Sequence, residues 1–346
     1  MLTLVMHGLV IAATLGCQQG DRREAAGEVS SNLPLVPAPV STTDPDVRAA
    51  QVELAEGRAW AATKHVAPAL RTSERRTPEA VLVAARAAAG WRGWTMVNAL
   101  LAYEPWLDSL FHGEGRELLA RSALERGDGT TAREHAEAAL AVRSDPGSHA
   151  FRQALLARAL DRLDARDSAA AGYRRAAEGL PLPREWLLLR AAGNTADAAQ
   201  RARLYASVKQ SVARARIEPT EAQALERFGM ALAAADAYEK LGDMPSAYRL
   251  RLSAAADAAQ RSALRSGLLG YLQRDASGTN LQRAIEVLDA AEPDLDATSQ
   301  QLVARRAAAG GVSARAASGF AKVPAALLTD ADVVSWSRAS IASGRP

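Results

Sequence analysis

The sequence predicts an all-α protein whose helix hairpins stack into an irregular α-solenoid. Ala, Leu, Arg and Glu, which all favour helices, dominate the 346 residues. Runs of Val, Ile, Thr and aromatic residues with the alternating pattern of strands are nearly absent. A unit of two short helices joined by a polar turn recurs along the chain. Such recurrence indicates stacked repeats that share a continuous core.

The clearest hairpin lies between Ser148 and Leu182, with a polar turn at residues 161–167. The residues at the expected helix–helix contact, and the proline that ends the unit, are Leu156, Ala157, Leu160, Ala169, Tyr173, Ala176 and Pro181. Small residues allow two helix axes to approach closely, and Tyr173 is expected to fill the gap toward the next hairpin. A tetratricopeptide-type repeat has this pattern over a period of about 34 residues. The predicted repeats are therefore tetratricopeptide-like.

Two further hairpins carry weaker versions of the same pattern. The upstream copy, about one period earlier, consists of Leu119, Ala120, Ala123, Ala132, Ala136, Ala139 and Pro146. The downstream copy consists of Ala231, Ala235, Tyr238, the turn Leu241-Gly242-Asp243, Ala247 and Ala254. Any Ala-rich hairpin can match so loose a pattern once by chance, but three copies together indicate repeats.

Start and stop signals divide the rest of the chain into helices. Thr77 and Pro78 form a strong helix start, and Gly90 ends that helix. The apolar face that follows could line a ligand groove, but helical spacing favours core packing; it consists of Trp91, Trp94, Val97, Leu100 and Leu101. The short segment 183–192 is almost fully apolar, so we expect it to be buried on most sides. Other expected helices and hairpins span residues 46–56, 58–70, 219–238, 245–275, 280–291, 298–320 and 330–343.

The first 17 residues have features of an export signal. Residues 1–16 are apolar, carry no Lys, Arg, Asp or Glu, and are shorter than the span of about 20 residues that crosses a membrane. Cys17 follows as the only cysteine, in the place of the lipidated cysteine of a bacterial lipoprotein signal. Thr14 stands where Leu is usual, and no basic residue precedes the apolar run. An ordinary secretory signal and a leader without function therefore stay open.

The sequence thus predicts three parts. Residues 1–17 form a signal peptide of lipoprotein or ordinary type, residues 18–44 a disordered linker rich in Gly, Pro and Ser, and residues 45–346 an α-helical repeat superhelix. The last expected helix has no partner, so truncation at the C-terminus stays open. We expect an exported protein, in the periplasm or anchored to the cell envelope, that touches the membrane only through a lipid on Cys17.

One segment resembles a known family. Residues 185–192 read Glu-Trp-Leu-Leu-Leu-Arg-Ala-Ala, and Ala202-Arg203-Leu204-Tyr205 follows among Ala-rich hairpins. With these motifs, residues 45–346 resemble the superhelix that precedes the catalytic domain of soluble lytic murein transglycosylases. That family cleaves peptidoglycan glycan strands with a Glu followed by Ser, and its catalytic domain carries a Gly-Leu-Met-Gln stretch; neither motif occurs here. The resemblance therefore implies a non-catalytic region that embraces glycan strands or partner proteins.

Motif searches identify no catalytic, cofactor-binding or metal-binding residue. The five histidines include no pair at metal-ligand spacing, and phosphate loops, nucleophile elbows and metalloprotease motifs are absent. Because 42 basic residues face 39 acidic ones, the net charge of +3 is weak evidence for nucleic-acid binding, and we expect no such partner. We therefore expect no cofactor.

The remaining charged residues are interpreted mainly as solvated. Surface charges that support helices are expected at Glu117, Glu125, Arg133 and Glu137. The basic pairs Arg174-Arg175 and Arg305-Arg306 could touch anionic cell-wall polymers, but a solvated helix face explains them better.

Two functional hypotheses follow. In the first, the chain is the non-catalytic superhelical part of a peptidoglycan lytic transglycosylase, and its partner is the glycan strand. In the second, it is a stand-alone tetratricopeptide-like periplasmic lipoprotein that mediates protein–protein interaction. An intracellular adaptor with a chance hydrophobic leader is a third alternative. Fold alone does not decide among them.

Overall fold

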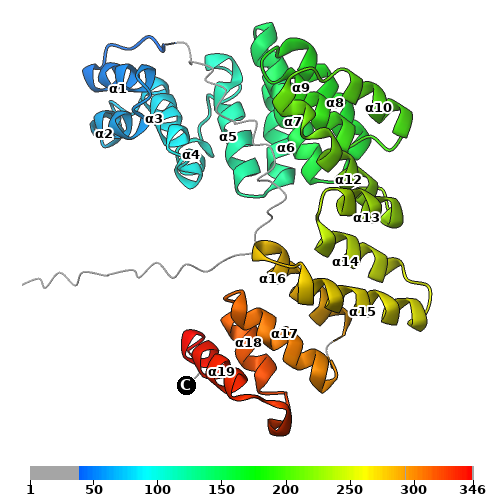
Figure 1. The fold of residues 1–346 in the computed structure, drawn as a ribbon. Helices are drawn as coiled ribbons and strands as arrows, with labels where there is room; N and C mark the ends of the chain where they lie inside the picture. Colours follow the sequence, from blue (N-terminus) through cyan, green and yellow to red (C-terminus); the bar gives the residue numbers. More distant parts are fainter. Residues whose placement is uncertain (1–38, 293, 345–346) are drawn as a thin grey trace, which may run out of the picture. The chain divides into compact units, whose positions relative to one another are not determined.

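The structure is a computed structural model that describes residues 39–292 and 294–344. These residues form helices and loops with no strand (Figure 1). The all-α class is therefore confirmed, whereas the tetratricopeptide type of the repeats stays a prediction. The predicted signal, with Cys17, and most of the predicted linker lie outside the described residues.

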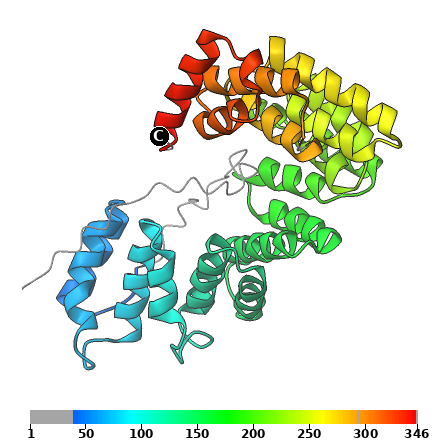
Figure 2. The same cartoon turned by 90° about the horizontal axis from the view of Figure 1, so that it is seen from below.

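The helices succeed one another in chain order, as the colours from blue to red show in Figure 1 and Figure 2. The first are α1 (Pro45–Ala55), α2 (Ala59–Leu70), α3 (Pro78–Gly90), α4 (Trp94–Leu101), the 3-10 turn η1 (Phe111–Gly113), α5 (Glu114–Glu125), α6 (Gly129–Ala141), α7 (Pro146–Arg162), α8 (Arg166–Gly179), α9 (Arg184–Gly193) and α10 (Ala198–Ala206). They are followed by α11 (Ser211–Arg214), α12 (Ile217–Arg227), α13 (Ala231–Lys240), α14 (Met244–Ala254), α15 (Ala258–Arg274), α16 (Gly278–Ala291), α17 (Ala297–Ala309), α18 (Ser313–Phe320), the 3-10 turn η2 (Ala325–Leu327) and α19 (Asp330–Ala342).

Most helices pack chiefly against their neighbours in the sequence, as α1 does against α2 and α7 against α8. Contacts between next-but-one helices, such as α5 with α7 and α14 with α16, connect successive pairs. The buried apolar residues form several clusters along the chain instead of one central core. This local packing is compatible with a helical solenoid, in which each unit contacts only nearby units.

The hairpin of α7 and α8 shows why small residues recur. Gly172 of α8 lies so close to α7 that an added Cβ would be 2.8 Å from the Cβ of Ala157. Tyr173 is buried and belongs to the same apolar cluster as Leu187 and Leu188 of α9. The expected role of Tyr173 between one hairpin and the next helix is therefore confirmed.

The predicted helix over residues 219–238 is wrong, because the structure divides it into α12 and α13. Gly229 lies between them with φ +76°, a left-handed conformation that glycine adopts without a steric penalty. The amide of Met230 donates to the carbonyl of Leu225, which closes the end of α12 in the manner of a Schellman motif. The two helices then pack against each other as a pair.

The aromatic segment after Gly90 belongs to the core, as expected, but not to one helix. Trp91 follows α3 as its C-cap, and its indole donates to the hydroxyl of Thr63 on α2 at 3.0 Å. Val97 and Leu101 of α4 are fully buried, and Trp91 and Trp94 pack at the edge of their cluster. The apolar face therefore packs against protein instead of lining a groove.

Glu117 corrects another expectation. It was predicted as a surface charge, but it is 8% exposed and lies beside the buried Arg152 of α7, with 3.3 Å between its Oε2 and the Arg152 Nε. Its burial depends on how α5 packs against α7, which the pattern of charges in the sequence does not record. Glu125 is exposed and ion-paired with Arg158, and Arg133 lies 3.7 Å from Glu137, as expected for surface pairs.

Arg152 joins segments that are far apart in the sequence. Its Nη1 donates to the carbonyl of Ala139 at 2.8 Å, and its Nη2 donates to the carbonyl of His112 at 2.5 Å. Phe111 and His112 both have positive φ, which is uncommon for residues other than glycine. Arg152 therefore holds a strained turn, the end of α6 and the carboxylate of Glu117 together.

Asp332 fixes the last described helix. It is buried, and both its oxygens accept hydrogen bonds from Arg305 of α17, at 2.6 and 2.7 Å. It also forms a capping box with Thr329 at the start of α19. These hydrogen bonds hold the pKa of Asp332 far below its usual range. The neighbouring Arg306 donates to the carbonyl of Ala276. Both residues of the pair Arg305-Arg306 therefore have a structural role.

We expect Glu117→Gln to change how stability depends on pH. Burial raises the pKa of Glu117 from 4.5 to about 7, against the opposing effect of the Arg152 guanidinium, while Glu114 adds to the rise and Arg121 opposes it. Between these two values the folded state binds more protons than the unfolded state, so this group makes stability fall as pH rises. The total effect is at most about 3 kcal/mol.

Urea denaturation of both proteins from pH 4.5 to pH 8 measures this difference. Glu117→Gln keeps the shape and a hydrogen-bond acceptor, so its free energy of unfolding should fall less over this range than that of the wild type. Identical pH profiles would show that Glu117 titrates near its usual value.

We expect Asp332→Ala to lower the free energy of unfolding by about 2 kcal/mol, because it removes a helix cap and two charge-assisted hydrogen bonds. Asp330→Ala is the matched control, because Asp330 is exposed in the first turn of the same helix. It should cost about 0.5 kcal/mol, the contribution of one charge to the helix dipole. Thermal denaturation of the three proteins tests this, and equal losses in both variants would contradict the assigned role of Asp332.

Candidate functional site

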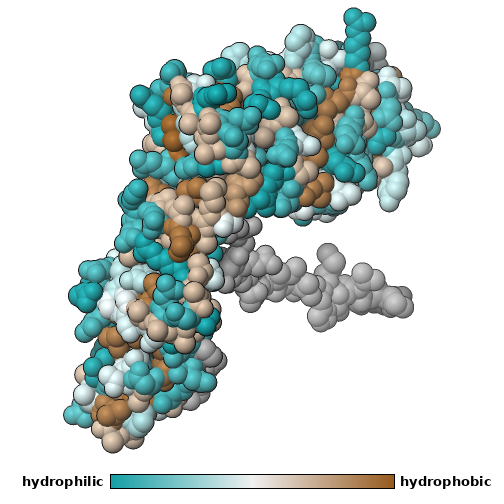
Figure 3. All heavy atoms as spheres, turned by 90° about the vertical axis from the view of Figure 1, so that its right-hand side faces the viewer, coloured by the Kyte–Doolittle hydropathy of each residue, from teal (hydrophilic) through white to brown (hydrophobic). Residues whose placement is uncertain are grey.

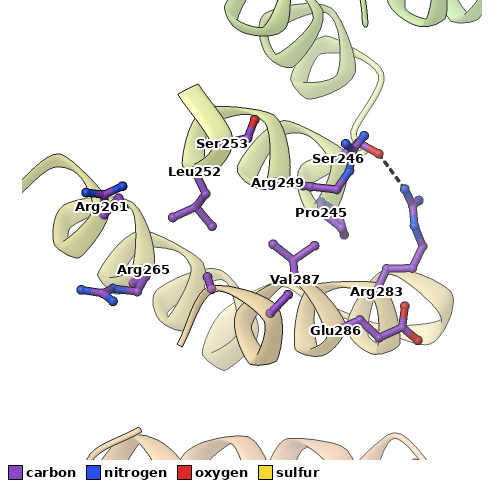
Figure 4. Close-up of a pocket in the computed structure, with 12 residues that line it drawn as sticks. Pro245, Ser246, Arg249, Leu252, Ser253, Arg261, Arg265, Arg283, Glu286 and Val287 are labelled. Atoms are coloured by element: carbon purple, nitrogen blue, oxygen red, sulfur yellow. Dashed lines mark hydrogen bonds between the residues drawn. The ribbon is translucent and has the colours of Figure 1, made fainter. Parts of the chain in front are cut away.

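A cleft with a volume of about 460 Å³ lies between α14, α15 and α16 (Figure 4). This volume falls in the range of ligand pockets, about 300–1,000 Å³. Leu252 and Val287, which line the cleft, pack against the apolar cluster that contains Leu268 and Leu281. The cleft is therefore a place where successive helices of the stack leave space between them.

One face of α14 forms the first wall. Pro245, Arg249 and Leu252 recur at helical spacing along this wall, and Ser246 and Ser253 stand beside them. Asp243 caps the start of α14 and accepts a hydrogen bond from the amide of Ser246. The cap therefore fixes the end of the helix at which Pro245 and Ser246 enter the cleft.

The other walls come from α15 and α16. Arg261 and Arg265 are one helical turn apart and therefore lie on the same side of α15. On α16, Arg283, Glu286 and Val287 share one face, and Ala290 and Ala291 continue that face. The walls from α14 and α16 thus combine long charged side chains with apolar ones, whereas α15 contributes two arginines.

Carboxylates at the margin of the cleft orient three of its four arginines. Arg249 lies 2.7 Å from Glu226, Arg265 lies 3.1 Å from Glu292, and Arg283 lies 3.0 Å from Asp243. Arg283 also donates to the hydroxyl of Ser246 at 2.7 Å, the contact drawn as a dashed line in Figure 4.

The carboxylate of Glu226 has a second donor, the hydroxyl of Tyr238 at 2.9 Å. Burial raises the pKa of Tyr238 well above its usual value, so this hydroxyl stays protonated. Within the described residues, the exposed Arg261 forms no ion pair.

The arginines occupy opposite ends of the cleft. In Figure 4, Arg261 and Arg265 lie at one end, and Arg249 and Arg283 lie at the other. Leu252 and Val287 point toward each other between them. The cleft therefore presents guanidinium groups at both ends of an apolar centre, an arrangement that can bind carboxylates and bury an aliphatic group at the same time.

The face of the molecule drawn in Figure 3 is mixed in character. On the face drawn in Figure 3, hydrophobic residues (brown) lie in small patches among hydrophilic ones (teal). The large apolar side chains with the highest exposure are far apart in the sequence: Tyr103 and Leu182 lie in connecting segments, and Ile341 lies in α19. Scattered apolar residues are ordinary on a protein surface, so the cleft is the stronger candidate.

The residues that carried the family resemblance have structural roles. Glu185 of α9 accepts hydrogen bonds from the amides of Lys209 and Gln210, at 3.0 and 2.7 Å. The hydroxyl of Tyr205 donates to Glu221 at 3.1 Å, and both lie away from the cleft. The expectation that the segment 183–192 is largely buried is confirmed by α9.

The sequence predicts two basic pairs on the surface, and it does not indicate the cleft. Arg174 and Arg175 are exposed on α8, and Arg305 pairs with Asp332 as described above. The spacing of Arg261 and Arg265 was a usable signal for one wall. Nothing in the order of residues indicated that this wall would face α14 and α16.

Cys17, the predicted lipidation site, lies outside the described residues. Among the residues that the structure describes, no group of three or more His, Cys, Asp or Glu side chains is placed to hold a metal ion. In the same part of the chain, no helix combines the length and the hydropathy that crossing a membrane requires.

Comparison with known proteins gives no assignment. No protein-family model matches the chain, and no curated protein matches it significantly. The cleft and the sequence patterns are therefore the features that indicate a function.

Proposed function

We propose that the chain is a non-enzymatic helical-repeat binding protein of the cell envelope, and that the cleft between α14, α15 and α16 is its binding site. The observation that carries the proposal is the placement of four arginines around an apolar centre. Arginine forms bidentate hydrogen bonds with carboxylates, and the apolar residues add affinity for aliphatic groups. Binding is the chemistry that this arrangement supports best.

The repeat type and the family are part of the proposal. Close contact at Gly172 and the packing of Tyr173 support tetratricopeptide-like hairpins. The resemblance of residues 45–346 supports the non-catalytic superhelical part of a lytic transglycosylase, with peptidoglycan as the partner. Carboxylates on the stem peptides of peptidoglycan are suitable groups for the arginines of the cleft.

Retention on insoluble peptidoglycan tests this proposal with the full chain. Salt is raised from about 0.1 M to about 1 M, which shortens the Debye length from ~10 Å to ~3 Å. Recognition by a shaped site should keep most of the protein bound, because short contacts inside a cleft are screened less than diffuse attraction. Arg261→Ala with Arg265→Ala should reduce the retained fraction.

Arg174→Ala with Arg175→Ala is the matched control, since it removes the same charge from an exposed helix face outside the cleft. It should bind as the wild type does. Binding that disappears at modest salt would contradict specific recognition of peptidoglycan. No binding at any salt would favour the alternative, a stand-alone lipoprotein whose partner is another envelope protein.

Export and lipidation predict a second result. We expect the wild-type protein in the membrane fraction of bacterial cells, and Cys17→Ser in the soluble envelope fraction, because the serine hydroxyl does not replace the thiol in lipid attachment. Cell fractionation followed by detection of the protein measures this. A cytoplasmic location of both proteins would contradict the envelope proposal, and a periplasmic location of the wild type would contradict lipidation alone.

A further inference from the structure

We propose that the cleft between α14, α15 and α16 binds an extended peptide segment of a partner protein, in which two acidic side chains flank an aliphatic one. This inference rests on the proposed function of the cleft as a binding site, and it names a protein segment, instead of peptidoglycan, as the ligand that the cleft fits best. It commits to a peptide because the walls provide three contacts of two kinds in a row. Guanidinium groups come first, an apolar centre follows, and guanidinium groups come again (Figure 4).

The positions of the arginines define where the acidic groups bind. Arg261 and Arg265 lie on one side of α15, so a single carboxylate at that end can contact both. Arg249 and Arg283 come from different helices and meet at the other end. A ligand that uses both ends must carry two acidic groups separated by the length of the cleft.

The centre of the cleft selects for an aliphatic group. Leu252 and Val287 point into it, and Ala290 and Ala291 also line the cleft. A leucine-sized side chain placed there would be removed from water. Such burial favours binding, because apolar surface leaves water.

The existing ion pairs do not prevent this binding. The side chains of Arg249 and Arg283 are 45% and 41% exposed, and ion pairs at such exposure contribute little stability. A guanidinium has five N–H donors, so one carboxylate leaves donors for another. The carboxylates of Glu226 and Asp243 therefore orient the arginines toward a ligand without using all their donors.

The local charge balance argues for discrete carboxylates over a polyanion. The charged groups in and beside the cleft are Arg249, Arg261, Arg265, Arg283, Glu226, Asp243, Glu286 and Glu292. Cations and anions are equal in number, so the region lacks the broad basic surface that binds nucleic acid. An uncharged sugar, in turn, offers no group for bidentate pairing with arginine.

Fluorescence anisotropy with the full chain and a labelled heptapeptide tests the inference. The probe has two aspartates that flank a central leucine, with glycine and alanine at the other positions. Arg261→Ala with Arg265→Ala should weaken its binding about tenfold or more, because charge-assisted hydrogen bonds to one carboxylate are lost. The Arg174→Ala, Arg175→Ala control, which removes the same charge, should stay within about twofold of the wild type.

Changes in the peptide test the pattern itself. Asparagine in place of both aspartates, or serine in place of leucine, should each weaken binding about tenfold, by loss of charge or of apolar burial. Glu286→Gln should strengthen binding about twofold to fivefold, because Glu286 is the acidic residue of the lining and repels the ligand. Circular dichroism of each variant verifies that its helices are retained.

The outcomes separate this inference from the proposed function. Tight binding of the probe that depends on the cleft arginines and on the leucine supports it, whatever the result with peptidoglycan. Equal weakening by the two double-arginine variants would show a general charge effect and overturn it. Failure of the wild type to bind the probe, together with cleft-dependent retention on peptidoglycan, would overturn the peptide ligand and leave the binding function intact.

Discussion

Close contact between neighbouring helices is the constraint on which the rest of this structure depends. The chain has few aromatic residues, and alanines supply much of its buried apolar surface. Alanine buries little area, so helices that pack through it must come close together to exclude water and make dispersion contacts. The contact between Gly172 and Ala157 shows how little room such packing leaves. A larger side chain there would separate two helices and also displace the next pair.

Buried arginines connect helices and turns that this packing alone does not hold together. Arg152 connects α7 to α5, to the end of α6 and to the turn before α5. Arg201 donates to Glu221 of α12 and to the carbonyls of Thr195 and Ala196. In both cases a guanidinium donates hydrogen bonds to carbonyl groups near helix ends. Without it, these carbonyls would need water as their hydrogen-bond donor.

The cleft follows from the same architecture. Where α14, α15 and α16 meet, the helices leave a space beside an apolar cluster. Long arginine side chains can occupy the margins of such a space while their stems cover apolar surface. Carboxylates at the margin then orient the guanidinium groups. A gap in the packing thereby becomes a surface with a specific pattern of charge and apolar area, which is the basis of the proposed binding function.

The sequence by itself determined the all-helical class, most helix boundaries and the contact residues of the α7–α8 hairpin. These features depend on helix propensity, caps and side-chain spacing, which act within one or two helical turns. Only the tertiary structure decided that α12 and α13 are separate and that Glu117 is buried against Arg152. It also decided that arginines from three helices surround one cleft. Each of these three features depends on which helices face each other. Packing between segments sets the orientation of the helices, and the order of residues in the sequence does not specify it.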